Sequence, residues 1–466
     1  MGAVPVRLTA SRAAALRVLK EVRTRDAWGH EILGRVLETL DVPDGDVAFM
    51  TRIAYGALAS EGTLDEVLDR YIDRPSRVHP LVRDALRIAT YELLYMRTPD
   101  RVAVHQGVEA VRSVEPRAVG MANAVLRRIA EAAPSFPWGD PETDIEALAR
   151  VTAHPLWLVR TLVHDLGLES ARSMLAADNE PAPLFLAHNP FAGSEADLMD
   201  VLNREGVEPR ACAPAGCIVA GHPSRAVRSA ALDEGACIVV DAAAQFVASI
   251  AAPQPAGRGV DLAAGRGTKT LLMQAAAVRA GGPAEITAAD VHPFKIALLE
   301  ERMGRLRVPG VKGVVADATR PDAIAALGGP SSADVVLLDA PCSGLGALRR
   351  HPEKRWRLDP ASIEALATLS QTMLKTASLL VRPGGFVVYS TCTVTDRENR
   401  QVVEGFLAGS AGGSFSTVSL ADSIPADWER FVTSEGWFRS VPEAGGPDGH
   451  FAAVLACEED RSPVSV

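Results

Sequence analysis

The chain has 466 residues, enough for about two to four domains, which excludes a small scaffold held together by disulfides. Hydrophobic residues make up 47% and charged residues 23%, as in typical soluble globular proteins, so long disordered regions are not expected. The formal net charge of −10 argues, taken alone, against a nucleic-acid partner, because such proteins usually present a basic surface.

The six cysteines are too few for a disulfide framework and form no CxxC pair, which favours a reducing compartment. No pair of His or Cys residues has the spacing of zinc ligands, so no metal is predicted. Arg7, Arg12 and Arg17 interrupt the apolar residues near the start, and no run of about 18 apolar residues occurs. We therefore expect a cytoplasmic protein with no membrane partner, and we expect it to be a monomer.

Residues 1–135 are predicted to form an all-α domain. One apolar stripe repeats at steps of four and three residues: Val82, Leu86, Ala89, Leu93 and Met96. Charged residues occupy the other faces of that helix: Arg83, Asp84, Arg87 and Glu92. Residues 1–131 contain 19 basic and 18 acidic residues, so the acidity of the chain lies almost entirely after this domain.

A linker is predicted between Ala132 and Thr143, where three prolines and a glycine occur in twelve residues. Residues 144–236 then combine a helical stretch, His154–His164, with short apolar runs, and predict a small α+β module. From residue 237 to 460, short β-rich runs alternate with helices, as in an α/β domain with a doubly wound parallel sheet. We expect strands at Gly259–Ala263, Glu285–Asp290, Val311–Ala316, Asp334–Asp339 and Gly385–Ser390.

The first candidate site is the loop in VDLAAGRGTKT, Val260–Thr270. Glycines at the carboxyl end of a parallel strand allow a ligand to approach the backbone. The third glycine of a dinucleotide fingerprint is missing, and Asp290 and Asp317 follow the next two strands. These acids suit the ribose hydroxyls and the adenine amino group of S-adenosylmethionine better than NAD. Tight turns and helix caps remain an alternative on spacing alone.

The second candidate site is LLDAPCSGLGALRRHPEKRW, Leu337–Trp356, where a strand delivers Asp339 and Cys342 to its carboxyl end. Basic residues cluster after this strand, together with Trp356: Arg349, Arg350, His351, Lys354, Arg355 and Arg357. Such a segment suits phosphates and bases, although a charge run is also typical of a solvated face.

The third candidate site is GGFVVYSTCTVTDREN, Gly384–Asn399, where a strand ends at Cys392. A lone buried cysteine is usually inert packing. Two thiols at one sheet edge, with Asp339 and a cofactor loop, indicate chemistry instead. A thiolate that adds to carbon 6 of a pyrimidine makes carbon 5 nucleophilic, and a carboxyl group at N3 stabilises the adduct. The base must be unstacked to be reached.

These motifs resemble the bacterial small-subunit ribosomal RNA cytosine-C5-methyltransferases of the Sun/Fmu (RsmB-type) group, which carry a fused NusB-like domain. The resemblance covers nearly the whole chain. It rests on NAVLRRI from Asn123, DAPCSGLGALRRHPE from Asp339, YSTCTVTDREN from Tyr389 and PEAGGPDGHFAAVL from Pro442. It implies a NusB-like RNA-binding domain at 1–135, an RNA-positioning module at 144–236 and a Rossmann-like, S-adenosylmethionine-dependent methyltransferase domain at 237–460.

The resemblance implies that Cys392 is the nucleophile and that Cys342 assists product release. DNA cytosine methyltransferases use the thiol of the PC pair as the nucleophile, so spacing alone leaves the two roles open. Asp339 would contact both the cofactor and N3 of the base. Further cofactor contacts are implied at Ala263, Ala264, Gly265, Arg266, Gly267, Thr268, Lys269, Asp290 and Asp317.

The loop AAGRGTK departs from the family's usual CAAPGGK, because Arg266 replaces proline and Thr268 replaces glycine. We expect cofactor binding to survive, since Gly267 and Lys269 are kept. The expected substrate is a single-stranded or flipped cytosine of 16S ribosomal RNA, contacted by Arg349, Arg350, His351 and Lys354. The alternatives are another RNA, such as transfer RNA, and a non-enzymatic RNA-binding or antitermination factor.

Overall fold

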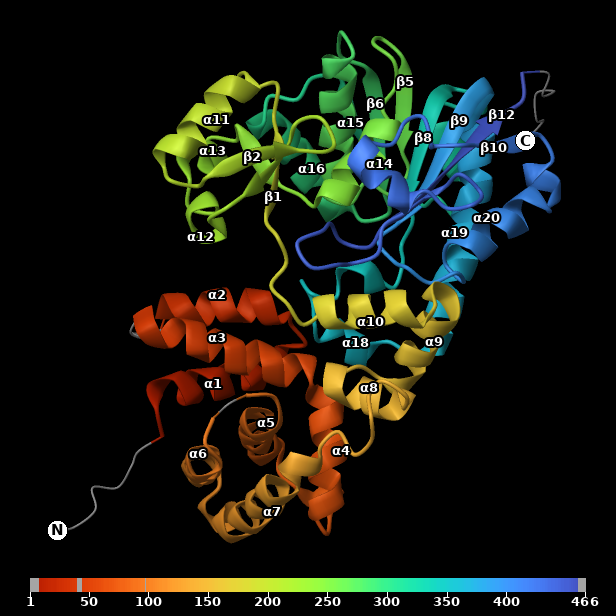
Figure 1. Ribbon diagram of the computed structural model, residues 1–466. Coiled ribbons are helices and arrows are strands. Elements are labelled where there is room, and N and C mark those ends of the chain that lie inside the picture. Colours follow the sequence, from red (N-terminus) through yellow and green to blue (C-terminus); the bar gives the residue numbers. More distant parts are fainter. Residues whose placement is uncertain (1–7, 40–43, 97, 460–466) are drawn as a thin grey trace. The chain divides into compact units, whose positions relative to one another are not determined.

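The computed structural model describes residues 8–39, 44–96 and 98–459 (Figure 1). The chain forms two compact units. The helical unit contains Met1–Glu180 and Leu348–Leu358, and the sheet unit contains Pro181–Ala347 and Asp359–Val466. No helix within the described ranges is both long and apolar enough to span a bilayer.

Seven helices form the body of the helical unit: α1 (Ala10–Arg25), α2 (Gly29–Thr39), α3 (Asp44–Ala59), α4 (Glu61–Tyr71), α5 (Pro80–Tyr95), α6 (Asp100–Val114) and α7 (Val119–Ala132). The predicted apolar stripe of α5 enters the core, where Val82, Leu86 and Ala89 are buried. Two acids of α5 are also buried, because each pairs with an arginine of α1. Glu92 accepts from Arg12 Nη2 at 2.6 Å, and Asp84 accepts from Arg23 Nη2 at 2.9 Å.

The segment predicted as a linker, 132–143, is instead ordered against this core. The ring of Phe136 lies 5.5 Å from that of Tyr95 and 5.4 Å from that of Trp138. The Arg70 guanidinium lies 4.0 Å from the centroid of the Trp138 ring. The prediction was wrong because Phe136 and Trp138 pack against the core, even though the segment is rich in proline and glycine.

Three further helices belong to the helical unit: α8 (Ile145–Thr152), α9 (Leu156–Leu166) and α10 (Leu168–Ala177). The Tyr95 hydroxyl donates to the carbonyl of Arg150 at 2.5 Å, and Arg150 Nε donates to Glu66 at 3.0 Å. The stretch 144–236, predicted as one module, is thus divided between the two units after Glu180.

The segment Leu348–Leu358, with α18 (Lys354–Arg357), also belongs to the helical unit. Arg355 is fully buried and donates to the carbonyls of Ala153 (3.1 Å) and Asp178 (3.3 Å) and to Asn179 Oδ1 (3.1 Å). These groups follow the ends of α8 and α10, where helix carbonyls lack partners within the helix. Arg355 therefore caps two helices, and burial lowers its pKa to about 10.

Trp356 is likewise a structural residue, because its indole N–H donates to the carbonyl of Ala59 at 2.7 Å. The interpretation of the basic segment as one surface patch with an aromatic is therefore wrong for Arg355 and Trp356. Both side chains complete the packing of the helical unit, which the local sequence gave no means to foresee.

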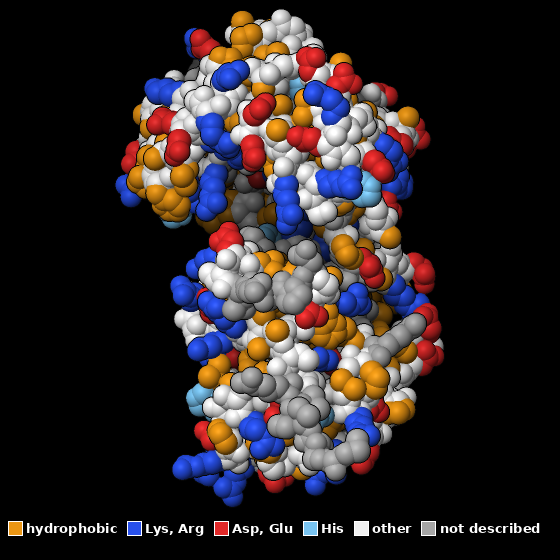
Figure 2. Space-filling view, turned by 90° about the vertical axis from the view of Figure 1, so that its left-hand side faces the viewer, with side chains coloured by type: hydrophobic (Ala, Val, Ile, Leu, Met, Phe, Trp, Pro, Cys, Tyr) orange, Lys and Arg blue, Asp and Glu red, His pale blue; other side chains and the backbone are white. Residues whose placement is uncertain are grey.

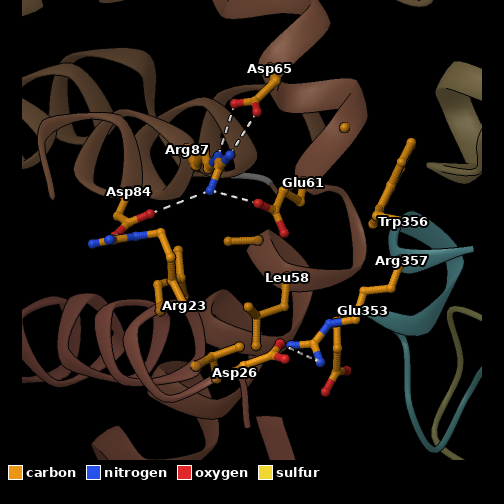
Figure 3. Close-up of a pocket in the computed structure, with 14 residues that line it drawn as sticks. Arg23, Asp26, Leu58, Glu61, Asp65, Asp84, Arg87, Glu353, Trp356 and Arg357 are labelled. Carbon is orange, nitrogen blue, oxygen red and sulfur yellow. Dashed lines mark hydrogen bonds and ion pairs between the residues drawn. The ribbon is translucent and has the colours of Figure 1, made fainter. Parts of the chain in front are cut away.

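A cavity of about 430 Å³ lies in the helical unit, with Trp356 in its wall (Figure 3). The Arg87 side chain lines this cavity, and its guanidinium pairs with Asp65 (2.6 Å), Glu61 (2.8 Å) and Asp84 (3.3 Å). These ion pairs connect α4 to α5, so the charges around Arg87 largely satisfy one another.

The sheet unit begins with a small antiparallel sheet of order β2-β3-β1-β4. Its strands are β1 (Phe185–His188), β2 (Pro209–Cys212), β3 (Cys217–Ala220) and β4 (Cys237–Val239). The helices α11 (Glu195–Arg204), α12 (Pro223–Ala226) and α13 (Ala230–Asp233) accompany it. The apolar runs at Leu184–Ala187 and Cys217–Ala220 correspond to β1 and β3.

The larger sheet has the order β10-β12-β9-β8-β5-β6-β7, with β11 (Phe438–Arg439) paired to β12. The five predicted strands are present as β5 (Arg258–Asp261), β6 (Glu285–Asp290), β7 (Val311–Val315), β8 (Ala333–Asp339) and β9 (Val381–Thr391), all parallel. The strands β10 (Phe415–Val418) and β12 (Phe451–Cys457) add an antiparallel edge that was not predicted.

Helices cover both faces of this sheet (Figure 1). On one face lie α14 (Ala242–Ile250), α15 (Thr268–Arg279) and α16 (Pro293–Arg305). On the other lie α17 (Asp322–Ala326), α19 (Pro360–Leu380) and α20 (Arg400–Leu407). The doubly wound prediction is confirmed. The strand order reverses between β5 and β8, the place where such sheets bind ligands.

We predict that Arg355→Met lowers the free energy of unfolding by about 3 kcal/mol, because it leaves several buried carbonyls without a donor. Arg357→Met is the matched control. Its partner Asp26 is 93% exposed, and such a surface pair contributes at most about 1 kcal/mol. Urea unfolding followed by tryptophan fluorescence measures both, and equal losses would contradict the capping role of Arg355.

Candidate active site

The loop between β5 and α15 provides a cradle with an open side. Gly265 has φ +57°, which favours glycine, and no heavy atom lies within 4 Å of the position a Cβ would take there. The backbone at Gly265 is thus accessible to a ligand. Thr270 occupies the position where a dinucleotide fingerprint has its third glycine, and its side chain is buried.

The loop is held at its base by two side-chain contacts. Thr270 Oγ1 donates to Asp261 Oδ2 at 2.7 Å, and burial raises the pKa of Asp261 to about 7. Arg302 of α16 donates to Thr268 Oγ1 at 2.7 Å and lies 3.5 Å from the carbonyl of Arg266. Arg266 and Thr268, the two residues that depart from the family's usual loop, are therefore both contacted by Arg302 of α16.

Acidic side chains follow the neighbouring strands as predicted. Asp290 ends β6, is largely buried, and accepts from its neighbour His292 N (2.9 Å) and from Lys295 Nζ (3.2 Å). Asp317 follows β7, and hydrogen bonds from the hydroxyl and amide of Thr319 lower its pKa. Since parallel strands end at the same edge, both acids lie on the edge that carries the glycine loop.

Asp339, at the end of β8, joins the loop to β9. Its Oδ2 accepts from Lys269 Nζ at 2.6 Å, and its Oδ1 accepts from Ser390 Oγ at 2.8 Å. Burial alone would lower the pKa of Lys269, but the Asp339 carboxylate outweighs it, so the pKa is raised and the amine stays charged. Lys269 thus places a half-buried positive charge at the sheet edge.

The two predicted thiols are brought together. Cys342 Sγ lies 3.4 Å from Cys392 Sγ, and the Cys392 amide donates to Cys342 Sγ at 3.3 Å. The hydrogen bond to Cys392, and then burial, raises the pKa of the Cys342 thiol well above its usual value. A raised pKa favours the protonated form of the Cys342 thiol.

Glu398 holds the two cysteine loops together and was missed in the sequence. Its carboxylate accepts from the amide and the hydroxyl of Ser343, both at 2.6 Å, and from Thr395 Oγ1 at 2.8 Å. Thr393 Oγ1 lies 2.8 Å from Ser343 Oγ. Each cysteine is thus followed by a residue in one buried network. The available signal was an acid close to the hydroxyl residues Thr393 and Thr395.

The glycines after Cys342 and before β12 allow three segments to meet. Gly346 N donates to the carbonyl of Cys392 at 3.0 Å, and Gly449 N donates to the carbonyl of Gly346 at 2.8 Å. A Cβ on Gly346 would lie 2.0 Å from the carbonyl oxygen of Gly449, so no larger residue fits. The block PEAGGPDGHF therefore reaches the cysteine loops.

The basic residues predicted to bind RNA belong to the helical unit, whereas the thiols belong to the sheet unit. The four side chains are half-buried: Arg349, Arg350, His351 and Lys354. The His351 ring lies 5.5 Å from that of Trp28. Across the described ranges 8–39, 44–96 and 98–459, no three His, Cys, Asp or Glu residues gather as a metal site would require.

Three family models match the chain: 16S rRNA methyltransferase RsmB/F at 248–456, the NusB family at 9–131, and a ferredoxin-like domain of RsmF/B-like methyltransferases at 154–223. The ribosomal RNA small subunit methyltransferase B of Thermus thermophilus is 32% identical, over 95% of this chain and 97% of that protein. The same-named protein of Pasteurella multocida is 27% identical, over 96% of each.

Solved structures share the fold. The crystal structure of PH0851 superposes with a TM-score of 0.79 at 24% identity, covering 97% of this chain and all of that one. A methyltransferase homolog protein from Pyrococcus horikoshii superposes with a TM-score of 0.56 at 21% identity, covering 66% of this chain and 97% of that one. With the family matches, these findings identify the chain as a methyltransferase of the RsmB/F family with a NusB-family domain.

Proposed function

We propose that this protein transfers a methyl group from S-adenosylmethionine to carbon 5 of a cytosine in 16S ribosomal RNA. The observation that carries the proposal is the pair of thiols 3.4 Å apart, beside Asp339 and Lys269 and on the same sheet edge as the glycine loop. The small-subunit names of the relatives favour ribosomal over transfer RNA. The intact thiol pair disfavours a factor without enzymatic activity.

The loop and the strand ends fit S-adenosylmethionine, whose role is to supply an electrophilic methyl group. The backbone of Ala263–Lys269 would hold its methionine part, since Gly265 leaves one side of the loop open. Asp290 would accept from the ribose hydroxyls, Asp317 from the adenine amino group, and Asp339 would flank the methyl-bearing end. The order of these acids along the sheet supports this assignment.

We assign the nucleophile to Cys392 and the release step to Cys342. The raised pKa of Cys342 supports these roles, because a thiol that keeps its proton can donate to a neighbouring thiolate. That donation favours ionised Cys392 for attack on carbon 6 and stabilises it again as the leaving group. Asp339 would share a proton with N3 of the ring and so stabilise the covalent adduct, while Lys269 balances charge beside it.

For RNA binding we propose local contacts from Arg349, Arg350, His351 and Lys354. Positive and negative side chains are interspersed on the face seen in Figure 2, which supports local contacts over one broad basic surface. The target cytosine would be unstacked, because carbon 6 must reach the Cys392 sulfur.

The roles of the two thiols predict opposite outcomes for their alanine variants. With RNA and S-adenosylmethionine, Cys342→Ala should accumulate a covalent protein–RNA band on a denaturing gel, because release is slowed. Cys392→Ala should form none, because no bond to carbon 6 can be made. Cys212→Ala, a half-buried cysteine of the small sheet, is the control. The reverse pattern would exchange the two roles.

Glu398 accepts hydrogen bonds from both cysteine loops, and we call these contacts the clamp. We predict that Glu398→Ala lowers kcat by about 10²-fold, because small misplacements of reacting groups have costs of this size. Glu398→Gln keeps one acceptor oxygen and should lose less. The KM for S-adenosylmethionine should change little, because the clamp lies at the thiols. Glu364→Ala, which breaks an exposed pair with Arg397, is the control. Equal kcat in Glu398→Ala and wild type would refute the clamp.

The RNA contact predicts that Arg350→Ala weakens RNA binding and reduces the slope of log K against log salt by about 1, because one phosphate contact is lost. Filter binding over a range of salt concentrations measures this slope. Arg382→Ala, at an exposed pair with Asp334 in the sheet unit, should leave it unchanged. An unaltered slope for Arg350→Ala would return the segment to an ordinary solvated face.

A further inference from the structure

His450 lies across the sheet from Cys392. It immediately precedes β12, whose residues Phe451 and Ala452 pair with Thr391 and Ser390 of β9. Extending this antiparallel register by one residue sets His450 opposite Cys392. Directly paired residues project to the same face of a sheet, and alternation returns each strand to that face every second residue. The alternation therefore places His450 on the face that Ser390 occupies.

That face also carries Asp339, which pairs with Ser390 in the parallel register of β8 and β9. Electrostatic interactions with both Lys269 and Asp339 act on His450. The carboxylate and the imidazole thus share one sheet face, and the proposed nucleophile directly follows the end of β9.

The imidazole of His450 is buried with an unused nitrogen. Its residue is 4% exposed, and Nδ1 has no hydrogen-bond partner among the described residues. The backbone is fixed, because its amide donates to Ser440 Oγ at 2.9 Å and Ser440 Oγ donates to the carbonyl of Asp448 at 2.7 Å. Buried polar atoms normally have partners, so an orphaned nitrogen beside reactive groups points to a partner that arrives with the substrate.

The proposed reaction needs a base, and three groups near the thiols, Cys342, Asp339 and Glu398, already have other partners. After methyl transfer, carbon 5 carries both a hydrogen and the new methyl group, and the hydrogen must leave as a proton. The raised pKa of the Cys342 thiol favours its protonated form, which cannot act as a base. Both oxygens of Asp339 accept hydrogen bonds, from Lys269 and Ser390, and Glu398 accepts from Ser343 and Thr395.

We propose that His450 is the general base that removes the proton from carbon 5 of the methylated adduct. The electrons of the C5–H bond form the C5–C6 double bond, the C6–S bond breaks, and its electrons return to Cys392 as the thiolate. The imidazole becomes imidazolium and then releases the proton to water. This inference rests on the proposed function, and it leaves Cys342 as the donor that stabilises the departing sulfur.

The surroundings of His450 keep it in the form that a base requires. Burial, and then the Lys269 cation, lower its pKa below the usual 6.5, against the opposing carboxylates of Asp241, Asp448 and Asp339. The imidazole is therefore neutral at pH 7. A base acts only when deprotonated, so the release rate should fall as the pH drops through this lowered value.

The step is measured with small-subunit ribosomal RNA labelled with tritium at carbon 5 of cytosine, incubated with S-adenosylmethionine and the full-length protein. Removal of the carbon 5 proton releases tritium to water. In His450→Gln, tritium release should fall by about 10²-fold or more, the usual contribution of a general base. A covalent protein–RNA band that carries the transferred methyl group should accumulate. His222→Gln, an exposed histidine paired with Glu208, is the control.

Two further readouts separate a base from a structural residue. The acidic limb of the pH profile of tritium release should be present in wild type and absent in His450→Gln. Added imidazole should restore release in His450→Ala, because a small base can enter the space left by the side chain. If circular dichroism shows that His450→Gln does not fold, the imidazole rescue of His450→Ala becomes the test of the role of His450.

The outcomes distinguish this inference from the proposed function. Unchanged tritium release in His450→Gln, or failure of imidazole to restore release in folded His450→Ala, overturns the role of His450 alone. Loss of the methylated adduct in a folded His450→Gln protein also overturns it, since the residue would then act before the release step. If wild type releases no tritium and methylates no cytosine in this RNA, the proposed function itself fails.

Discussion

One buried carboxylate, that of Glu398, joins the two loops that carry the thiols. The strands β8 and β9 are parallel neighbours, so their carboxyl ends meet, but strand pairing stops at Asp339 and Ser390. Beyond that point the chains would be free to diverge. Glu398 accepts from both sides of the gap, through Ser343 on one loop and Thr395 on the other. Together with the hydrogen bonds from Gly346 N to the Cys392 carbonyl and from Cys392 N to Cys342 Sγ, this anchor holds the sulfurs 3.4 Å apart.

The same sheet edge carries charges of both signs, on the partly buried side chains of Lys269 and Asp339. Lys269 reaches Asp339 from the loop after β5, so the element proposed to hold the cofactor also sets the electrostatics beside the thiols. The hydrogen bond to Cys392, and then burial, raises the pKa of the Cys342 thiol, and burial lowers the pKa of the His450 imidazole. These protonation states suit the roles proposed for the two groups, Cys342 as the donor to the leaving sulfur and His450 as the base at carbon 5.

The charge of the chain is informative only when resolved locally. The net value of −10 suggested that nucleic acid was an unsuitable partner, yet the chain belongs to a family of 16S rRNA methyltransferases. The basic segment after Cys342 explains only part of the difference. Arg355 caps α8 and α10, and Arg357 pairs with Asp26. Fewer positive charges are therefore available to bind RNA than the sequence indicated.

The sequence by itself determined the doubly wound sheet, its five parallel strands and the residues at their carboxyl ends. It could do so because hydrophobic periodicity and glycine placement are local signals. It failed where contacts join distant segments. The clamp by Glu398, the caps by Arg355, the antiparallel partner β12 and the position of His450 opposite Cys392 all depend on residues far apart in the chain. Only the tertiary structure decided these features, because a hydrogen-bond donor and its acceptor, or two paired strands, carry no mutual signal until folding brings them together.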